Sequence, residues 1–101
     1  MTIALSGDHG NPRPALVIQS DLFDAHPSVS ILPVTSELPD APLFRIVVEP
    51  SDSNGLRKTS QVMVDKIQTV ARSKVGKTIG RLERETLVAV KRALAVFAGF
   101  A

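Results

Sequence analysis

Short apolar segments separated by turn residues make up most of the chain, and they predict a protein built mainly from β-strands. In the segment 44–49, Phe44, Ile46 and Val48 alternate with the other positions, as in a half-buried strand. Apolar or β-branched runs at 2–5, 15–19 and 29–34 predict further strands, and 78–82 is expected to be extended. The stretch 61–70 predicts one or two strands bent around Asp65–Lys66. A cap and a short helical turn are expected at 20–23.

The last part of the chain predicts a helix from 83 to 98, because apolar residues recur there at intervals of three and four positions. The buried stripe would consist of Leu87, Val90, Leu94 and Phe97. Gly99 is a plausible end of this helix. About five or six short strands with short connections, followed by one helix, indicate an α+β fold. We expect a small, strongly curved antiparallel β-barrel with the C-terminal helix packed on it.

Length and composition indicate one compact domain spanning residues 1–101. The chain has 44% hydrophobic residues, which is enough for a modest core, and it has no cysteine for disulfides or thiolate metal sites. No apolar run is long enough to span a membrane, and no secretory signal is evident. These features lead us to expect a cytoplasmic protein without a metal site or a cofactor.

Basic residues are concentrated in one part of the chain. The formal net charge is only +2, but the stretch 66–82 has five basic residues and no acidic one. Such a cluster can contact a nucleic-acid backbone, or it can simply keep a loop solvated. All four aromatic residues are Phe, which argues against a base-stacking platform of the RNA-recognition-motif type.

Arg13 is the strongest candidate for a functional residue. It lies between Pro12 and Pro14 at the start of an apolar strand, and a residue that precedes proline is restricted to extended geometry. A guanidinium held in this way suits an anion that must be bound in one orientation. The preceding loop contains Asp8 and His9, and Asp8 could reach the same anion. Thr35 follows the strand 29–34, so its hydroxyl would emerge beside Arg13 if the two strands are neighbours.

Three segments together resemble the MazF/PemK/Kid family of toxin endoribonucleases. The first is Arg-Pro followed by an apolar strand at 13–19, and the second is Pro-Val-Thr-Ser at 33–36. The third runs from Val-Asp-Lys-Ile-Gln-Thr-Val at 64–70 to Gly-Arg-Leu at 80–82, before the last helix. Their order and spacing cover nearly the whole chain. The resemblance implies an SH3-like barrel with a C-terminal helix, in agreement with the strand and helix pattern.

The resemblance also implies an activity and partners. It implies a toxin of a type II toxin–antitoxin system that cleaves single-stranded RNA at selected sequences, without a metal or cofactor. It implies a homodimer and a cognate antitoxin, with DNA contacted only indirectly through the antitoxin complex, and no association with membranes. Arg13 and Thr35 match the catalytic Arg and Thr of the family, and Asp8 takes the place of the Glu in its mobile loop.

The expected reaction uses the 2′-hydroxyl of the RNA as the nucleophile and leaves a 2′,3′-cyclic phosphate. Arg13 would stabilise the developing negative charge, and Thr35 would donate a hydrogen bond to the same group. Either Asp8, by position, or His9, by its usual pKa, would accept the proton, and the sequence leaves both open. The residues expected to contact RNA are Ser36, Asp65, Lys66, Gln68, Arg72, Lys74 and Lys77.

The chain departs from the family pattern in three places. Its N-terminal strand is expected to be shortened, Met63 stands where the Kid branch has a second arginine, and Asp8 is one methylene shorter than the usual Glu. Two alternatives remain on the same fold. One is a gyrase-binding toxin of the CcdB type, although the C-terminal segment lacks the Trp of that group. The other is a member that binds an antitoxin without cleaving RNA.

Overall fold

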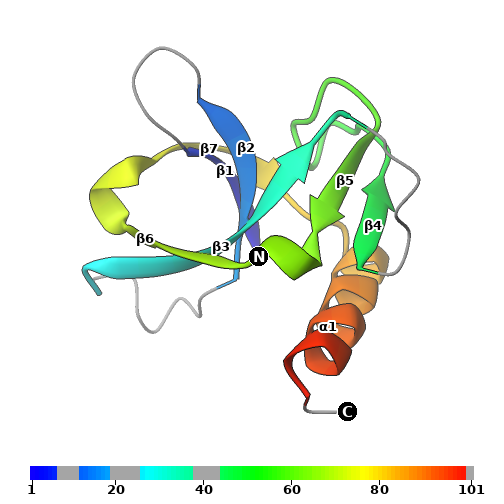
Figure 1. The fold of residues 1–101 in the computed structure, drawn as a ribbon. Coiled ribbons are helices and arrows are strands. Elements are labelled where there is room, and N and C mark those ends of the chain that lie inside the picture. Colours follow the sequence, from blue (N-terminus) through cyan, green and yellow to red (C-terminus); the bar gives the residue numbers. More distant parts are fainter. Residues whose placement is uncertain (7–11, 19–25, 38–43, 100–101) are drawn as a thin grey trace.

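A curved antiparallel sheet and one C-terminal helix form the protein. The computed structural model describes residues 1–6, 12–18, 26–37 and 44–99 (Figure 1). The strands are β1 (Thr2–Ser6), β2 (Arg13–Val17), β3 (Ser28–Thr35), β4 (Arg45–Val48), β5 (Ser60–Met63), β6 (Gln68–Ala71) and β7 (Val75–Arg81). Two 3-10 turns, η2 (Val64–Lys66) and η3 (Arg72–Lys74), and the helix α1 (Arg84–Ala98) complete the elements. The helical turn expected at 20–23 lies outside the described residues.

The sheet order is β4-β5-β3-β2-β1-β7, with β6 paired to β3, and every pairing in the described part is antiparallel. The expected α+β fold with a small curved barrel is therefore confirmed, although the described strands do not close into a complete ring. The count of five or six strands was too low, because the described residues alone form seven. The η2 turn at Asp65–Lys66 divides the stretch 61–70 into β5 and β6. β1 pairs with β2 on one side and with β7 on the other.

Strand β3 joins the two halves of the sheet. Its first half, Ser28 to Ile31, pairs with β6, whereas Val34 and Thr35 pair with β5. Pro33 lies between these two ladders. Proline lacks an N–H, and it is tolerated there because neither β5 nor β6 pairs with this residue. The opposite edge of β3 pairs with β2 through residues 31–33. A single strand thus connects the β2–β1–β7 side to the β5–β4 side.

The main core lies between the sheet and α1. Ile3, Leu16, Leu32 and Val62 are fully buried there, and Val90 of the helix packs against the same cluster. The helix prediction is confirmed to within one residue at its start. It ends at Gly99, whose φ of 83° is left-handed and whose N–H bonds the carbonyls of residues 95 and 96.

The segment 49–59 between β4 and β5 is fixed by one buried side chain. Asn54 is fully buried, and its Oδ1 accepts hydrogen bonds from the N–H groups of Ser51 (3.0 Å) and Leu56 (2.9 Å). Its Nδ2 donates to the carbonyl of Glu49 (2.9 Å) and to Oε1 of Glu83 (2.9 Å) at the start of α1. All of the hydrogen-bonding capacity of this side chain is used to join the segment to the helix.

Two glycines allow the same segment to lie directly on β7. Gly55 has a φ of 71°, and a Cβ there would lie 2.1 Å from the carbonyl oxygen of Ile79. A Cβ on Gly80 would lie 2.3 Å from the carbonyl carbon of Asn54. The two backbones therefore touch, and this contact sets the position of the basic residues 57–58 that follow.

The carboxylate of Glu83 is stabilised in its charged form. Burial by itself raises the pKa of this group, but hydrogen bonds from Asn54, from Ser51 and from its own backbone outweigh that effect. The pKa of Glu83 therefore lies below its ordinary value. Glu83 also stands at the N-cap of α1, where a negative charge is favoured by the helix dipole.

Candidate active site

Strand register brings the sequence candidates Arg13 and Thr35 onto one line across the sheet. Ser6 of β1 is paired with Arg13, and Thr35 is paired with Gln61, which is paired in turn with Val47. The β2–β3 ladder pairs residues 15–17 with 33–31, and continuing it by two residues sets Arg13 opposite Thr35. Directly paired residues point to the same face of a sheet. We call these five residues the cross-strand row.

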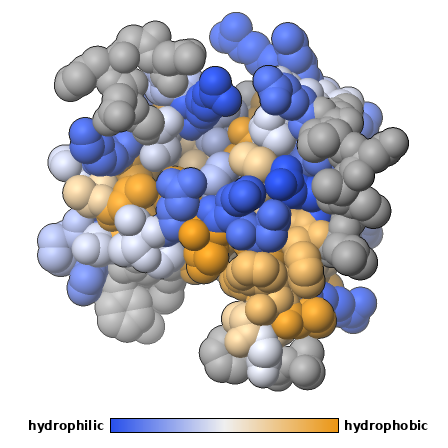
Figure 2. Space-filling model, in the orientation of Figure 1, coloured by the Kyte–Doolittle hydropathy of each residue, from blue (hydrophilic) through white to orange (hydrophobic). Residues whose placement is uncertain are grey.

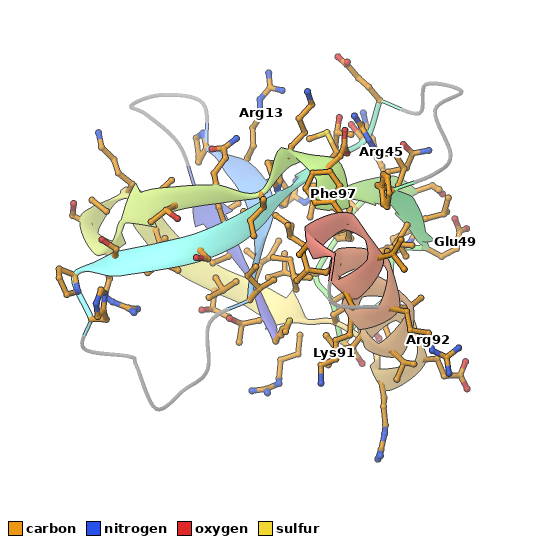
Figure 3. All side chains as sticks on the ribbon, turned by 60° about the horizontal axis from the view of Figure 1, so that its bottom comes forward. Arg13, Arg45, Glu49, Lys91, Arg92 and Phe97 are labelled. Carbon is orange, nitrogen blue, oxygen red and sulfur yellow. The ribbon has the colours of Figure 1, made fainter. Side chains whose placement is uncertain are left out.

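Arg13 presents its charge to solvent from the first position of β2. Its side chain is exposed, and no described carboxylate forms an ion pair with it. Figure 3 shows Arg13 projecting from the end of the strand away from the sheet. Pro12 and Pro14 restrict the backbone on both sides of Arg13. The side chain therefore starts from a rigid backbone, and its guanidinium donors are available.

The hydroxyl of Thr35 is oriented by a local turn. The N–H of Glu37 donates a hydrogen bond to Thr35 Oγ1 over 3.1 Å, which occupies one lone pair of that oxygen. The hydroxyl hydrogen stays available for donation to another group. Arg13 and Thr35 therefore lie on neighbouring antiparallel strands, which is the condition that the sequence set for a guanidinium and a hydroxyl to emerge side by side.

A pocket of about 450 Å³ lies at the ends of β2 and β3, lined by residues adjacent in sequence to the row but by none of the row itself. Pro12, Pro14 and Ser36 line one part of it, and Arg57 and Lys58 line another. The remaining lining residues are Leu5, Gly55, Leu56, Ser60 and Ile79. Arg57 and Lys58 were not among the candidates suggested by the sequence. Two consecutive cations in a turn were visible in the sequence, but their place on the wall of this pocket depends on the contact between the segment 49–59 and β7.

The carboxylate of Asp65 is paired with an arginine from another strand. Arg45 Nε donates to Asp65 Oδ1 over 2.9 Å, and a second guanidinium nitrogen approaches Oδ2 at 3.4 Å. Arg45 is also the register partner of Met63. An arginine thus lies beside the position where the sequence lacked one, although it comes from β4. Arg45 and Arg13 emerge on the same side of the sheet (Figure 3).

The other expected RNA contacts are distributed over several elements. Lys66 lies exposed on η2, Gln68 on β6 and Lys77 on β7, while Lys74 ends η3. Arg72 is half-buried, and its Nε donates to the carbonyl of His26 over 2.6 Å. This bond ties η3 to the segment that leads into β3. Asp8 and His9 lie outside the described residues.

The chain matches a family model described as PemK-like, MazF-like toxin of type II toxin–antitoxin system over residues 1–98. The chain belongs to the PemK/MazF toxin family. A curated relative from Mycolicibacterium smegmatis, named as a probable endoribonuclease MazF, is 48% identical over 92 residues. That match covers 91% of this chain and 84% of the relative. A gyrase-binding toxin of the CcdB type is therefore not favoured.

Solved structures of PemK/MazF toxins have the same fold. The Mycobacterium tuberculosis toxin MazF-mt6 matches with a TM-score of 0.85 at 22% identity, over 100% of this chain and 99% of that one. A MazE–MazF complex from Deinococcus radiodurans matches with a TM-score of 0.83 at 21% identity, over 99% and 93%. A mycobacterial endoribonuclease in complex with its cognate antitoxin matches with a TM-score of 0.81 at 22% identity, over 99% and 93%.

In the described part of the chain, α1 lacks the length and apolar character that a membrane-spanning helix needs. Across the same residues, no three His, Cys, Asp or Glu side chains gather as they would around a metal ion. The functional groups of the cross-strand row are a guanidinium, hydroxyls and a carboxamide.

Proposed function

We propose that this chain is a metal-independent endoribonuclease that cleaves single-stranded RNA at selected sequences. The observation that carries the proposal is that Arg13 starts β2 and Thr35 ends the neighbouring antiparallel strand β3, so both lie at the same end of this strand pair. The family membership and the name of the M. smegmatis relative support the same activity.

The proposed reaction needs no metal and no protein nucleophile. The 2′-oxygen of a ribose attacks the adjacent phosphorus, the bond to the 5′-oxygen breaks, and a 2′,3′-cyclic phosphate and a 5′-hydroxyl result. Arg13 and Thr35 donate to the phosphoryl oxygens, where negative charge increases in the transition state. The proton of the 2′-hydroxyl goes to a base, for which Asp8 and His9 are the candidates, and a proton must reach the 5′-oxygen as it leaves.

The RNA strand would lie along the cross-strand row and into the pocket beside it. Arg57 and Lys58 suit the phosphates that flank the scissile one, and the apolar lining of the pocket suits a base. Ser36 contributes a hydroxyl at the same place, while Lys66, Lys74 and Lys77 supply positive charge farther along the sheet. The pocket would contribute to the choice of the sequence that is cut.

We also propose that the protein works in the cytoplasm as a homodimer that a cognate antitoxin inhibits. Exposed apolar side chains on α1 support an interface with a second copy, and Figure 2 shows an apolar area over this helix. Val88, Val96 and Phe97 are 41%, 58% and 42% exposed. Light scattering should give the mass of a dimer for the wild type and a smaller mass for Val96→Lys. A monomeric wild type would contradict the dimer.

Cleavage of a long unstructured RNA in excess EDTA tests the activity. We expect cuts that recur at one short sequence, with 2′,3′-cyclic phosphate and 5′-hydroxyl ends. Arg13→Ala should lower the rate by about 10²–10³-fold, as for the loss of one donor to a transition-state anion. Arg92→Ala, which removes an exposed arginine from α1, should cleave at the wild-type rate.

Two results would reject the assignment. One is intact RNA after incubation with folded wild-type protein in EDTA. The other is an equal rate for the Arg13→Ala and Arg92→Ala variants, which would mean that the charge of Arg13 is not used. A folded wild type that binds an antitoxin but leaves RNA intact would support the non-cleaving alternative.

A further inference from the structure

Gln61 is a buried polar residue with an unused acceptor. Only 8% of the residue is exposed, and its Oε1 has no hydrogen-bond partner among the residues that the structure describes. The other buried polar residues of the neighbourhood are satisfied: Asn54 is fully bonded, and Ser60 Oγ donates to the carbonyl of Lys58 over 2.8 Å. Native proteins rarely leave such an atom unpaired.

The position of Gln61 connects this acceptor to the proposed site. Gln61 is the direct register partner of Thr35 on β3, and its other neighbour in the row is Val47 on β4. Its side chain therefore points to the face that carries Arg13 and Thr35, whereas the adjacent Val62 points into the core. Neighbouring strands are about 4.8 Å apart, so Gln61 is roughly one strand spacing from Thr35 and two from Arg13.

The chemistry of the amide indicates what kind of group it would bind. An apolar residue would fill this place without leaving an unpaired acceptor, which is costly when buried. The amide oxygen accepts a hydrogen bond but carries no charge, so it does not repel a phosphate bound to Arg13. The terminal torsion of Gln is broad, and a rotation about it can bring the oxygen to the surface.

We propose that Gln61 is a positioning residue that accepts a hydrogen bond from a ribose 2′-hydroxyl of the strand bound at Arg13 and Thr35. This inference rests on the proposed endoribonuclease activity. The 2′-hydroxyl is a donor that every RNA nucleotide has and DNA lacks. The amide oxygen is too weak a base to take the proton of the 2′-hydroxyl. Gln61 therefore holds the ribose in place, and another group acts as the general base. The site thereby selects RNA over DNA before the chemical step.

The test compares two uncleavable oligonucleotides as competitive inhibitors of the wild-type protein. Both have the sequence that the protein cuts, one with 2′-amino groups, which retain a donor, and the other with 2′-deoxy positions, which have none. We expect the wild type to prefer the 2′-amino oligonucleotide by about tenfold, because one hydrogen bond to an otherwise unpaired acceptor is lost. Gln61→Met, which keeps the length of the side chain but removes the acceptor, should bind the two equally.

A second variant and a stability measurement separate this role from a structural one. Gln61→Glu keeps an acceptor oxygen at the same reach, so it should keep the preference for the 2′-amino oligonucleotide. Its negative charge should weaken the binding of both oligonucleotides. The melting temperature of Gln61→Met should be no lower than that of the wild type, because an unpaired buried polar group has been removed. If Gln61→Met still prefers the 2′-amino oligonucleotide as the wild type does, and RNA cleavage is intact, the inference about Gln61 is overturned but the proposed function is not. Failure of the wild type to cleave RNA overturns the proposed function and this inference together.

Discussion

Replacing Asn54 by alanine should disconnect the segment 49–59 from the helix. The change removes the Oδ1 that accepts from the N–H groups of Ser51 and Leu56. It also removes the Nδ2 that donates to the Glu49 carbonyl and to the Glu83 carboxylate. The variant side chain can form none of these bonds, so the effect is a loss of connection rather than a change of charge.

The loss of unfolding free energy in Asn54→Ala depends on which of the former partners can form hydrogen bonds with water instead. Leu56 is 8% exposed, so its N–H would stay without an acceptor, at a cost of about 1–3 kcal/mol. The charge-assisted bond to Glu83 contributes about 1.5 kcal/mol, at the low end of its range because Glu83 is only half-buried. Together these give about 3 kcal/mol, which lowers the melting temperature of a domain of this size by roughly 12–24 °C.

Thermal unfolding followed by circular dichroism at neutral pH measures this effect. Asp52→Ala, an exposed position in the same segment, serves as the matched control and should melt within about 4 °C of the wild type. If Asn54→Ala also melts within that margin, the segment is not held by this side chain and our account of the buried network is incorrect.

Three other substitutions probe the same framework. In urea titrations, Gly80→Ala should lower the unfolding free energy by about 1–3 kcal/mol, because its methyl group would clash with the backbone of Asn54. Gly76→Ala, whose methyl group would have ordinary contacts, should leave the unfolding free energy unchanged. The lowered pKa of Glu83 adds stability above its unfolded pKa that is lost as the pH falls through the folded value. The stability advantage of the wild type over Glu83→Gln should therefore shrink in acid, and an advantage independent of pH would contradict this. Asp65→Asn leaves Arg45 without its counter-charge and should cost about 1–2 kcal/mol in urea unfolding, whereas an unchanged midpoint would show that the ion pair contributes nothing.

Local patterns in the sequence predicted most of the elements. Alternation at 44–49 corresponds to β4, and the stripe at 83–98 corresponds to α1 with Gly99 at its end. The strand β7 is longer than expected and begins at Val75, because Val75 pairs with Ser6 at the far end of β1. Pairing to a distant strand, rather than local propensity, determines that boundary.

The candidate site was only partly accessible from the sequence. Arg13 and Thr35 were found because prolines and strand ends mark them locally, but only the sheet shows that their strands are neighbours. Gln61 carries no local signal, since its importance comes from lying opposite Thr35. Arg45 was likewise unrecognised as the partner of Asp65, because 20 residues of chain separate the two.

The exchange of partners along β3 at Pro33 has a consequence for how the molecule could be controlled. Residues 31–33 of β3 pair with β2, whereas Val34 and Thr35 pair with β5, so a change in the angle between the two halves would move Thr35 relative to Arg13. A molecule bound elsewhere that widens or narrows this angle would change the fit of the two donors to a phosphate without touching either residue. If the protein cleaves RNA as we propose, an inhibitor bound to one half of the sheet would lower the activity by changing this spacing as well as by occupying the site.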